Sequence, residues 1–282
     1  MAMLTETRDV RDFDEVVVQG RGDLILEQGD VESVVIEADA AVMPHVKAAV
    51  EGRRLVLGLE HWWDSLMFPL APLRFRVSAV MVNRVTISGS GSVRAEALRS
   101  DDLRLEISGS GDMAFPQLTA RAVSLGISGG GKMKVSGEAE SIAVRISGSG
   151  NVQTGELATQ AAEVRISGSG NVSVNPAQTL DVQISGSGAV KYTGQPQISQ
   201  RISGSGSVVH MAAGGMETGE SKSSRSVRAS RGPRPPVRPE QPRPASPPLG
   251  ATAAEQMAIL KMVEEGRITP EEADTLLQAM GA

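Results

Sequence analysis

The chain of 282 residues carries a formal net charge of −5, contains no cysteine, and has only 2% aromatic residues. The lack of cysteine excludes disulfides and thiolate metal sites, and the few aromatic side chains leave aliphatic residues to fill any core. No run of about 18 apolar residues occurs, and the first residues lack the basic and apolar segments of a secretory signal, so the sequence predicts a cytoplasmic protein without a transmembrane segment.

The first 82 residues show the pattern of an irregular β structure. Residues 18–26, VQGRGDLIL, have a branched residue and two glycines at the same positions as ISGSGDMAF at residues 107–115, and we interpret them as a degenerate copy of that repeat. Strand-like segments follow at residues 31–38, 53–59 and 72–82, and residues 40–50, AAVMPHVKAAV, are predicted to be helical. We interpret these segments as the atypical first coils and the cap that a stacked array needs at its open end.

One apolar segment, HWWDSLMFPL at residues 61–70, does not follow the strand alternation and holds both tryptophans of the chain. Two interpretations remain open: the segment is a lid over the first coil, or it is an exposed hydrophobic contact patch. Its candidate interaction residues are Trp62, Trp63, Leu66 and Phe68.

A five-residue motif then recurs seven times at intervals of 18 to 20 residues. It reads Ile-Ser-Gly-Ser-Gly, with Gly in place of the second Ser in the third copy, and it begins at Ile87, Ile107, Ile127, Ile146, Ile166, Ile184 and Ile202. A fixed period of this length is typical of a solenoid, in which each repeat is one coil that buries its apolar face against its neighbours.

Aliphatic residues stand two positions before most of these isoleucines and again six positions after them, and the positions between are mostly polar. This alternation predicts two short strands per coil, joined by a corner at which glycine supplies a positive φ. The predicted fold is therefore all-β: a single-stranded parallel β-helix over residues 1–212, with coils stacked in register about 4.8 Å apart.

The composition changes to Ser, Arg and Pro at residues 213–252, which are predicted to form a disordered linker. Seven basic and three acidic residues give residues 213–250 a charge of +4. The P-x-x-P spacings in this stretch fit either a semi-rigid spacer or a ligand for an aromatic groove.

Residues 253–282 are predicted to form a helical hairpin. Gly266 ends the first helix, and Thr269, Pro270 and Glu272 form the start signal of the second. So short a hairpin rarely folds alone, so we expect it to bind a protein partner or to associate with itself. The apolar residues expected at this contact are Ile259, Leu260, Val263, Ala273, Leu276, Leu277 and Met280.

The pattern FDEVVVQGRGDLILEQGD, followed by VVIEAD, RRLVLGL and the ISGSG coils, resembles the head GIN domain of putative auto-transporter adhesins over residues 10–212. The resemblance implies a parallel β-helix of right-handed sense. The tail, with its EEGRITPEEA segment, resembles the SHOCT-like short C-terminal domain, and this implies an oligomerisation or docking role for the hairpin.

No catalytic, metal-binding or cofactor-binding residue is predicted. The three histidines, His45, His61 and His210, lie far apart, and no helix follows the glycine corners to make them phosphate loops. A small-molecule ligand is not expected. Specific nucleic-acid binding is not expected either, because residues 1–212 carry −5. Arg145, Arg165 and Arg201 share one column of the repeat, which we interpret as a solvated face.

These features predict a non-enzymatic scaffold: a rigid solenoid tethered to a docking hairpin, and by resemblance linked to the cell envelope or to stress sensing. Two alternatives are kept. One is a filament of the bactofilin type, built by end-to-end stacking of β-helices. The other is a carbohydrate-binding or adhesin β-helix.

Overall fold

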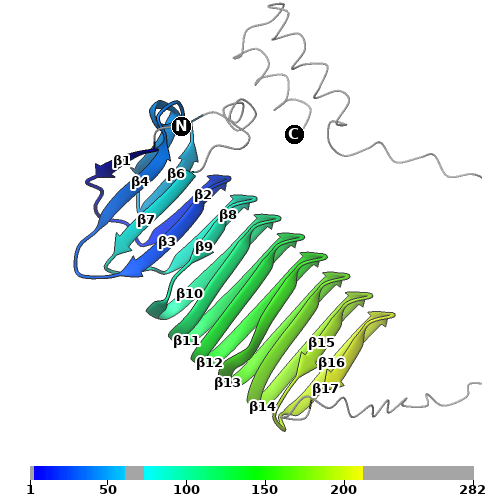
Figure 1. The fold of residues 1–282 in the computed structure, drawn as a ribbon. Coiled ribbons are helices and arrows are strands. Elements are labelled where there is room, and N and C mark those ends of the chain that lie inside the picture. The colour runs from blue at the N-terminus through cyan, green and yellow to red at the C-terminus, as the bar shows by residue number, and fades with distance from the viewer. Residues whose placement is uncertain (1–2, 61–72, 212–282) are drawn as a thin grey trace, which may run out of the picture. The chain divides into compact units, whose positions relative to one another are not determined.

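The computed structural model describes residues 3–60 and 73–211, and the strands in these two ranges join into one continuous sheet that winds into a solenoid (Figure 1). None of the helices in the described ranges is long and apolar enough to cross a membrane. The elements are β1 (Met3–Arg8), β2 (Glu15–Gly20), β3 (Asp23–Gln28), β4 (Ser33–Asp39), η1 (Met43–His45), β5 (Val46–Glu51), β6 (Arg54–Leu59), β7 (Leu73–Ala79), β8 (Arg84–Gly89), β9 (Ser92–Arg94), β10 (Ala97–Gly109), β11 (Asp112–Gly129), β12 (Lys132–Gly148), β13 (Asn151–Gly168), β14 (Asn171–Gly186), β15 (Ala189–Tyr192), β16 (Gln197–Gly204) and β17 (Ser207–His210).

The repeats stack as parallel strands in exact correspondence, which confirms the predicted β-helix. Ile107 pairs with Ile87 on one side and with Ile127 on the other, and the same correspondence continues to Ile202. Each coil therefore places its isoleucine directly on the isoleucine of the coil before it.

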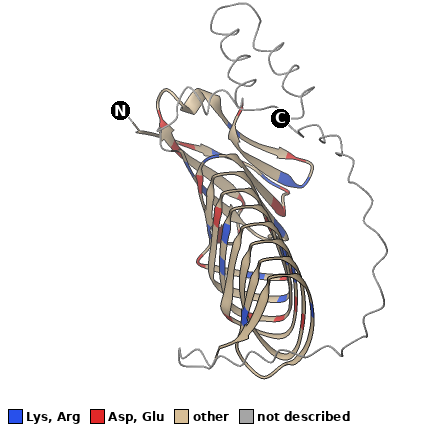
Figure 2. Ribbon diagram, turned by 90° about the vertical axis from the view of Figure 1, so that its right-hand side faces the viewer, with Lys and Arg blue, Asp and Glu red and all other residues tan. Residues whose placement is uncertain are grey.

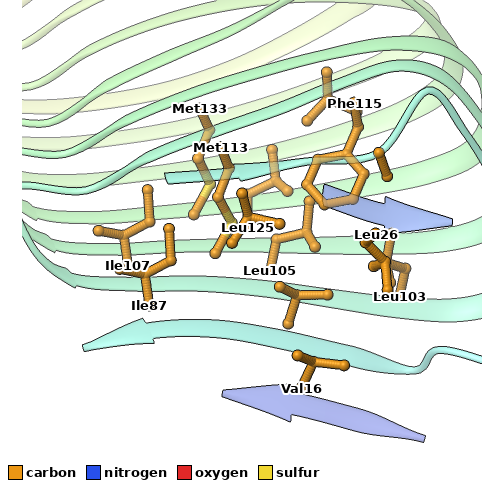
Figure 3. Packing of buried hydrophobic residues seen from close by; sticks show 14 of the residues in the cluster. Val16, Leu26, Ile87, Leu103, Leu105, Ile107, Met113, Phe115, Leu125 and Met133 are labelled. Atoms are coloured by element: carbon orange, nitrogen blue, oxygen red, sulfur yellow. The ribbon is translucent and has the colours of Figure 1, made fainter. Parts of the chain in front are cut away.

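The interior of the solenoid is filled by these columns of aliphatic side chains. The isoleucines from Ile87 to Ile184 are at most 3% exposed, as are Leu105 and Val144 in the column two residues earlier. Met113 and Met133 stack in a third column, and Phe115 fills the space beside it (Figure 3). A side chain in this core is thus packed against its equivalents from neighbouring coils, as the period predicted.

From β10 to β14 each coil is one long strand that ends only at the glycine corner, so the prediction of two short strands is wrong for these coils, whereas short strands flank the corner in the first coil, β8 and β9, and in the last, β16 and β17. β11, for example, runs without a break through 18 residues. Its pairing with β12 shifts register between Phe115 and Leu118 and then continues to Gly129. A bulge bends a strand without ending it, and the alternation of side chains does not show this.

The first glycine of each corner is required by its backbone. Gly148 has φ of 123°, and a Cβ built there would lie 2.6 Å from the carbonyl oxygen of Gly129 in the preceding coil. The amide of Ser149 donates to this same oxygen at 3.0 Å. The close approach of the two corners therefore continues the hydrogen-bond ladder between coils, and only glycine permits it.

The second glycine is required for a different reason, which the sequence pattern of a single coil does not reveal. Gly150 does not have a positive φ, but a Cβ there would lie 2.6 Å from Cγ2 of Ile127. The same overlap with the isoleucine of the preceding coil recurs from Gly111 to Gly206. The branched isoleucine thus occupies the space that the glycine of the next coil leaves empty.

The N-terminal strands form a cap of mixed direction. The predicted degenerate repeat is confirmed, because Val18 pairs with Ile87 and Leu24 with Val93 in the first regular coil. Beyond this coil, β4 runs antiparallel to both β1 and β7, and β5 runs antiparallel to β6. The prediction of a helix at residues 40–50 is wrong: one 3₁₀ turn containing Pro44 leads into strand β5. Proline has no amide to donate, and the pairing of β5 with β6 satisfies the residues that follow.

Asp14 fastens this cap to the array. Its side chain is 13% exposed, and Oδ2 accepts hydrogen bonds from Arg53 Nη2 at 2.6 Å and from Asn83 Nδ2 at 3.0 Å. Its main-chain carbonyl accepts from the amide of Asn83, just before β8. The hydrogen bond from Arg53 is the main reason that the pKa of Asp14 lies below its ordinary value.

We predict that Gly148→Ala lowers the free energy of unfolding by about 3 kcal/mol, through backbone strain and overlap with the neighbouring coil. Gly130→Ala is the matched control, because a Cβ at Gly130 meets nothing within 4 Å and its φ is not positive. Thermal unfolding followed by circular dichroism measures both. Equal midpoints for the two variants would contradict the steric explanation of the corner.

We predict that Asp14→Asn lowers stability at neutral pH by about 1 kcal/mol or less, because Arg53 is largely exposed and water screens the pair. The folded-state pKa of Asp14 is depressed, so its contribution is present above the unfolded value of about 4 and is lost as pH falls through the folded value. Unfolding midpoints of the two proteins should therefore converge in acid. If the unfolding midpoints of the two proteins differed equally at every pH, the ionised carboxylate of Asp14 would not be what stabilises the folded protein.

Candidate functional site

The outward face of the strands that lead into the corners carries two regular columns of side chains. The residue after each isoleucine is an exposed serine, and in-register pairing aligns seven of them along the array. These serines are Ser88, Ser108, Ser128, Ser147, Ser167, Ser185 and Ser203. The residue before each isoleucine forms the second column: Thr86, Glu106, Gly126, Arg145, Arg165, Gln183 and Arg201.

A shallow groove of about 740 Å³ follows these two columns from Thr86 to Arg201. At a coil spacing of about 4.8 Å, it extends roughly 30 Å along the solenoid. A second groove of about 590 Å³ continues on the same face, over small residues such as Ser124 and Ala143 and the carboxylates Glu163 and Asp181. Figure 2 shows charged residues of both signs along the coils, so the sign within the groove depends on which of them are paired.

Ion pairs neutralise part of the groove. Glu106 binds Arg104 with 2.6 Å between Oε1 and Nη2, and Glu163 binds Arg165 with 2.5 Å between the same atom types. Within residues 3–60 and 73–211, neither Arg145 nor Arg201 has a carboxylate in ion-pair distance. These two guanidinium groups leave the groove with a net positive charge.

Arg145 stands in an electrostatically unfavourable position. It pairs directly with Arg165 of the next coil, and on its other side it pairs with Gly126, which offers no side chain. Like charges at directly opposed positions of a sheet destabilise it. Arg84 and Arg104 are opposed in the same way, but Glu15 and Glu106 neutralise them. The middle of the groove, at Arg145, therefore carries an uncompensated positive charge, whereas the arginines at its start are neutralised.

Gly126 deepens the groove without being needed for the fold. Its φ is not positive, and a Cβ built there would approach only the side chain of Glu106 among side chains, at 3.6 Å. This is ordinary van der Waals contact. The notch between Glu106 and Arg145 thus exists because this position has no side chain, unlike the glycines of the corners, which the stacking requires.

The remaining polar groups do not assemble a catalytic or metal centre in the ranges the structure describes. No group of three or more His, Asp or Glu residues there is arranged to hold a metal ion. His210 lies on the last coil, where Nε2 is 2.9 Å from the carbonyl oxygen of Gly194 and the ring is 5.0 Å from that of Tyr192. These contacts give His210 a packing role at the end of the array.

Both groups of residues predicted to mediate interactions lie outside the described residues, and their roles stay predictions. The first group is Trp62, Trp63, Leu66 and Phe68, and the second is Ile259, Leu260, Val263, Ala273, Leu276, Leu277 and Met280. The groove was missed because its arginines were interpreted as an ordinary solvated column. The signal that could have indicated it was present in the repeat alignment: a strand glycine, then two aligned arginines.

A family model described as "Putative auto-transporter adhesin, head GIN domain" matches residues 12–196, and a model described as "SHOCT-like domain" matches residues 255–282. Both resemblances noted from the motifs are thereby confirmed. A search of curated proteins finds no match.

Solved structures with the same fold include a putative adhesin from Bacteroides fragilis, with a TM-score of 0.68 and 23% identity over 74% of this chain and 97% of that one. A putative lipid binding protein from Parabacteroides distasonis has a TM-score of 0.62 and 22% identity, over 74% and 96% of the two chains. A putative adhesin from Parabacteroides merdae has a TM-score of 0.60 and 20% identity over the same shares. At these identities the likeness establishes the β-helix fold alone.

We predict that Arg145→Gln raises the free energy of unfolding by about 0.5 kcal/mol at low ionic strength, because it removes the repulsion from Arg165. Added salt should reduce this gain, since it screens exposed charges. Arg121→Gln is the matched control: it removes the same charge but breaks the ion pair with Asp102, so it should not stabilise. Urea unfolding at two salt concentrations tests the pair, and a loss of stability in Arg145→Gln would contradict the prediction.

Proposed function

Since the chain belongs to the family of putative auto-transporter adhesins with a head GIN domain, we propose that it is a non-enzymatic binding scaffold. In this proposal the solenoid presents its grooved strand face to a ligand. The C-terminal hairpin supplies the contact through which several copies, or a partner protein, are held together.

The observation that carries this proposal is the in-register stack itself. Seven coils hold equivalent residues one above another, so the exposed columns form a continuous surface whose spacing is set by backbone hydrogen bonds. Such a surface is rigid without any ligand, and preorganisation lowers the entropic cost of binding an extended partner.

The names of the structural neighbours favour a binding role. One is called a putative adhesin and another a putative lipid binding protein, which suggests either a surface ligand or a lipid. The described coils favour binding on the outside. Their interior is filled with close-packed aliphatic side chains from Ile87 to Val190, which leaves the exposed grooves as the places for a ligand.

The hairpin part of the proposal rests on the match to a SHOCT-like domain at residues 255–282 and on the amphipathic pattern there. A multivalent arrangement suits a scaffold whose individual contacts are weak, because linked copies bind a repetitive ligand with higher avidity. Where in the cell this happens stays a prediction, and the adhesin names suggest the surface as an alternative to the cytoplasm.

The filament alternative is less well supported by the two ends of the described solenoid. End-to-end stacking requires that one end continue the strand pattern of the other. β16 and β17 at the C-terminal end run parallel to their neighbours, whereas β1 and β5 in the N-terminal cap run antiparallel to theirs. An interface between unlike ends needs complementary patterns before it can propagate.

We predict that the full-length protein has a mass in solution that is a multiple of its chain mass of 29.5 kDa, whereas a version ending at Gly250 has the mass of one chain, because it lacks the hairpin through which copies associate. Light scattering coupled to size-exclusion chromatography measures both. Leu276→Asp with Leu277→Asp in the full-length chain is the control that keeps the length, and it should give the monomer mass. If each of the three proteins had the mass of one chain, self-association would be contradicted. Docking to another protein would then be tested by a pull-down with the full-length chain.

A further inference from the structure

We infer that the groove beside the serine column binds an extended glycan that carries carboxylates, such as a chain of uronic acids, lying along the solenoid. This inference rests on the proposed binding function and names its ligand. Three features of the groove carry it: two uncompensated arginines in one column, Arg145 and Arg201, a parallel row of hydroxyls, and a notch at Gly126.

The arginines indicate an anionic ligand. Arg145 and Arg165 are opposed on adjacent coils, about 4.8 Å apart along the axis, and Arg201 follows two coils later. The folded protein bears the repulsion between the first two without an internal carboxylate for Arg145 in the part of the chain that the structure describes. A carboxylate bound between them would remove this repulsion, and guanidinium groups bind carboxylates with two parallel hydrogen bonds.

The serines indicate a ligand rich in hydroxyls. Each serine hydroxyl both donates and accepts, and the row repeats at every coil next to the arginine column. Gln183, between Arg165 and Arg201 in their column, adds an amide that also donates and accepts. A sugar ring presents hydroxyls of the same dual character. A glycan with acidic groups thus matches both columns at once, whereas a plain polyanion matches only the arginines.

Other extended ligands fit the groove less well. An extended peptide gains affinity by adding a strand to a free sheet edge, but the strands under the groove from β10 to β14 are paired on both sides. A single-stranded nucleic acid requires aromatic side chains for base stacking, and none lines the groove. A neutral glycan lacks the charge that would compensate Arg145 and Arg201.

The notch at Gly126 leaves space in the groove for part of the ligand. Ser124, Gly126 and Ser128 lie side by side on one coil and leave a low point beside Arg145. Because a side chain at Gly126 would meet only ordinary contacts, this position offers a variant that blocks the groove without changing its charge or the packing of the core.

The test is calorimetric titration of the full-length protein with oligogalacturonate, with its methyl-esterified form as the neutral control. The free acid should bind and the ester should not. Arg145→Gln and Arg201→Gln should each weaken binding about tenfold, as expected for the loss of a hydrogen bond to a charged group. Gly126→Leu should weaken it similarly by filling the notch, whereas Arg121→Gln, away from the groove, should leave it unchanged.

Several outcomes would overturn the inference. These are equal binding of the ester, equal weakening by Arg121→Gln, no effect of Gly126→Leu in a variant that melts like the parent protein, or tighter binding of polyglutamate or polyphosphate. Absence of oligogalacturonate binding would also overturn it. Failure here is distinguishable from failure of the proposed scaffold, because the masses measured by light scattering do not depend on this groove.

Discussion

The contact on which this solenoid depends is the packing of each isoleucine against the second glycine of the next coil. Cγ2 of Ile127 occupies the space that a Cβ at Gly150 would need, and the same relation recurs along the array. The first glycine complements it by letting neighbouring corners approach closely enough to share a hydrogen bond. Together the two contacts prevent a coil from slipping by one residue, since any slip would place a Cβ where neither neighbour leaves room.

This fixed register explains why the surface is as regular as the core. A serine that follows each isoleucine must lie over the serine of the coil before it, and a residue that precedes it must do the same. The register therefore creates unfavourable neighbours as well as favourable ones. Arg104 lies beside Arg84, and carboxylates neutralise both side chains. Arg145 lies beside Arg165, and among the described residues an ion pair with a carboxylate is formed only by Arg165. The unfavourable pair persists because the register is decided by the core, whose free energy far exceeds that of an exposed charge pair.

The two ends of the described solenoid are built differently, and this bears on the proposed association of copies. At the N-terminal end, antiparallel strands and the Asp14–Arg53 pair close the stack. At the other end, Ile198 and Ile202 are 38% and 39% exposed, whereas Leu180 and Ile184 one coil earlier are almost fully buried. The proposed association through the C-terminal hairpin does not require the two ends of the solenoid to match.

The sequence alone determined the β-helix, its period, the columns of its core and the degenerate coil at Val18, because each of these is a repeated local pattern that only stacking in register satisfies. The tertiary structure decided what depends on contacts between coils or on irregular segments. It showed why the second glycine is needed, since that reason lies in the isoleucine of another coil. Residues 40–50 form a turn and the start of strand β5 and not a helix, because β5 pairs with β6, and local helix propensity does not reveal this partner. The tertiary structure also made the arginine column part of a groove, since only the folded arrangement tells which charges are neutralised and which remain available to a ligand.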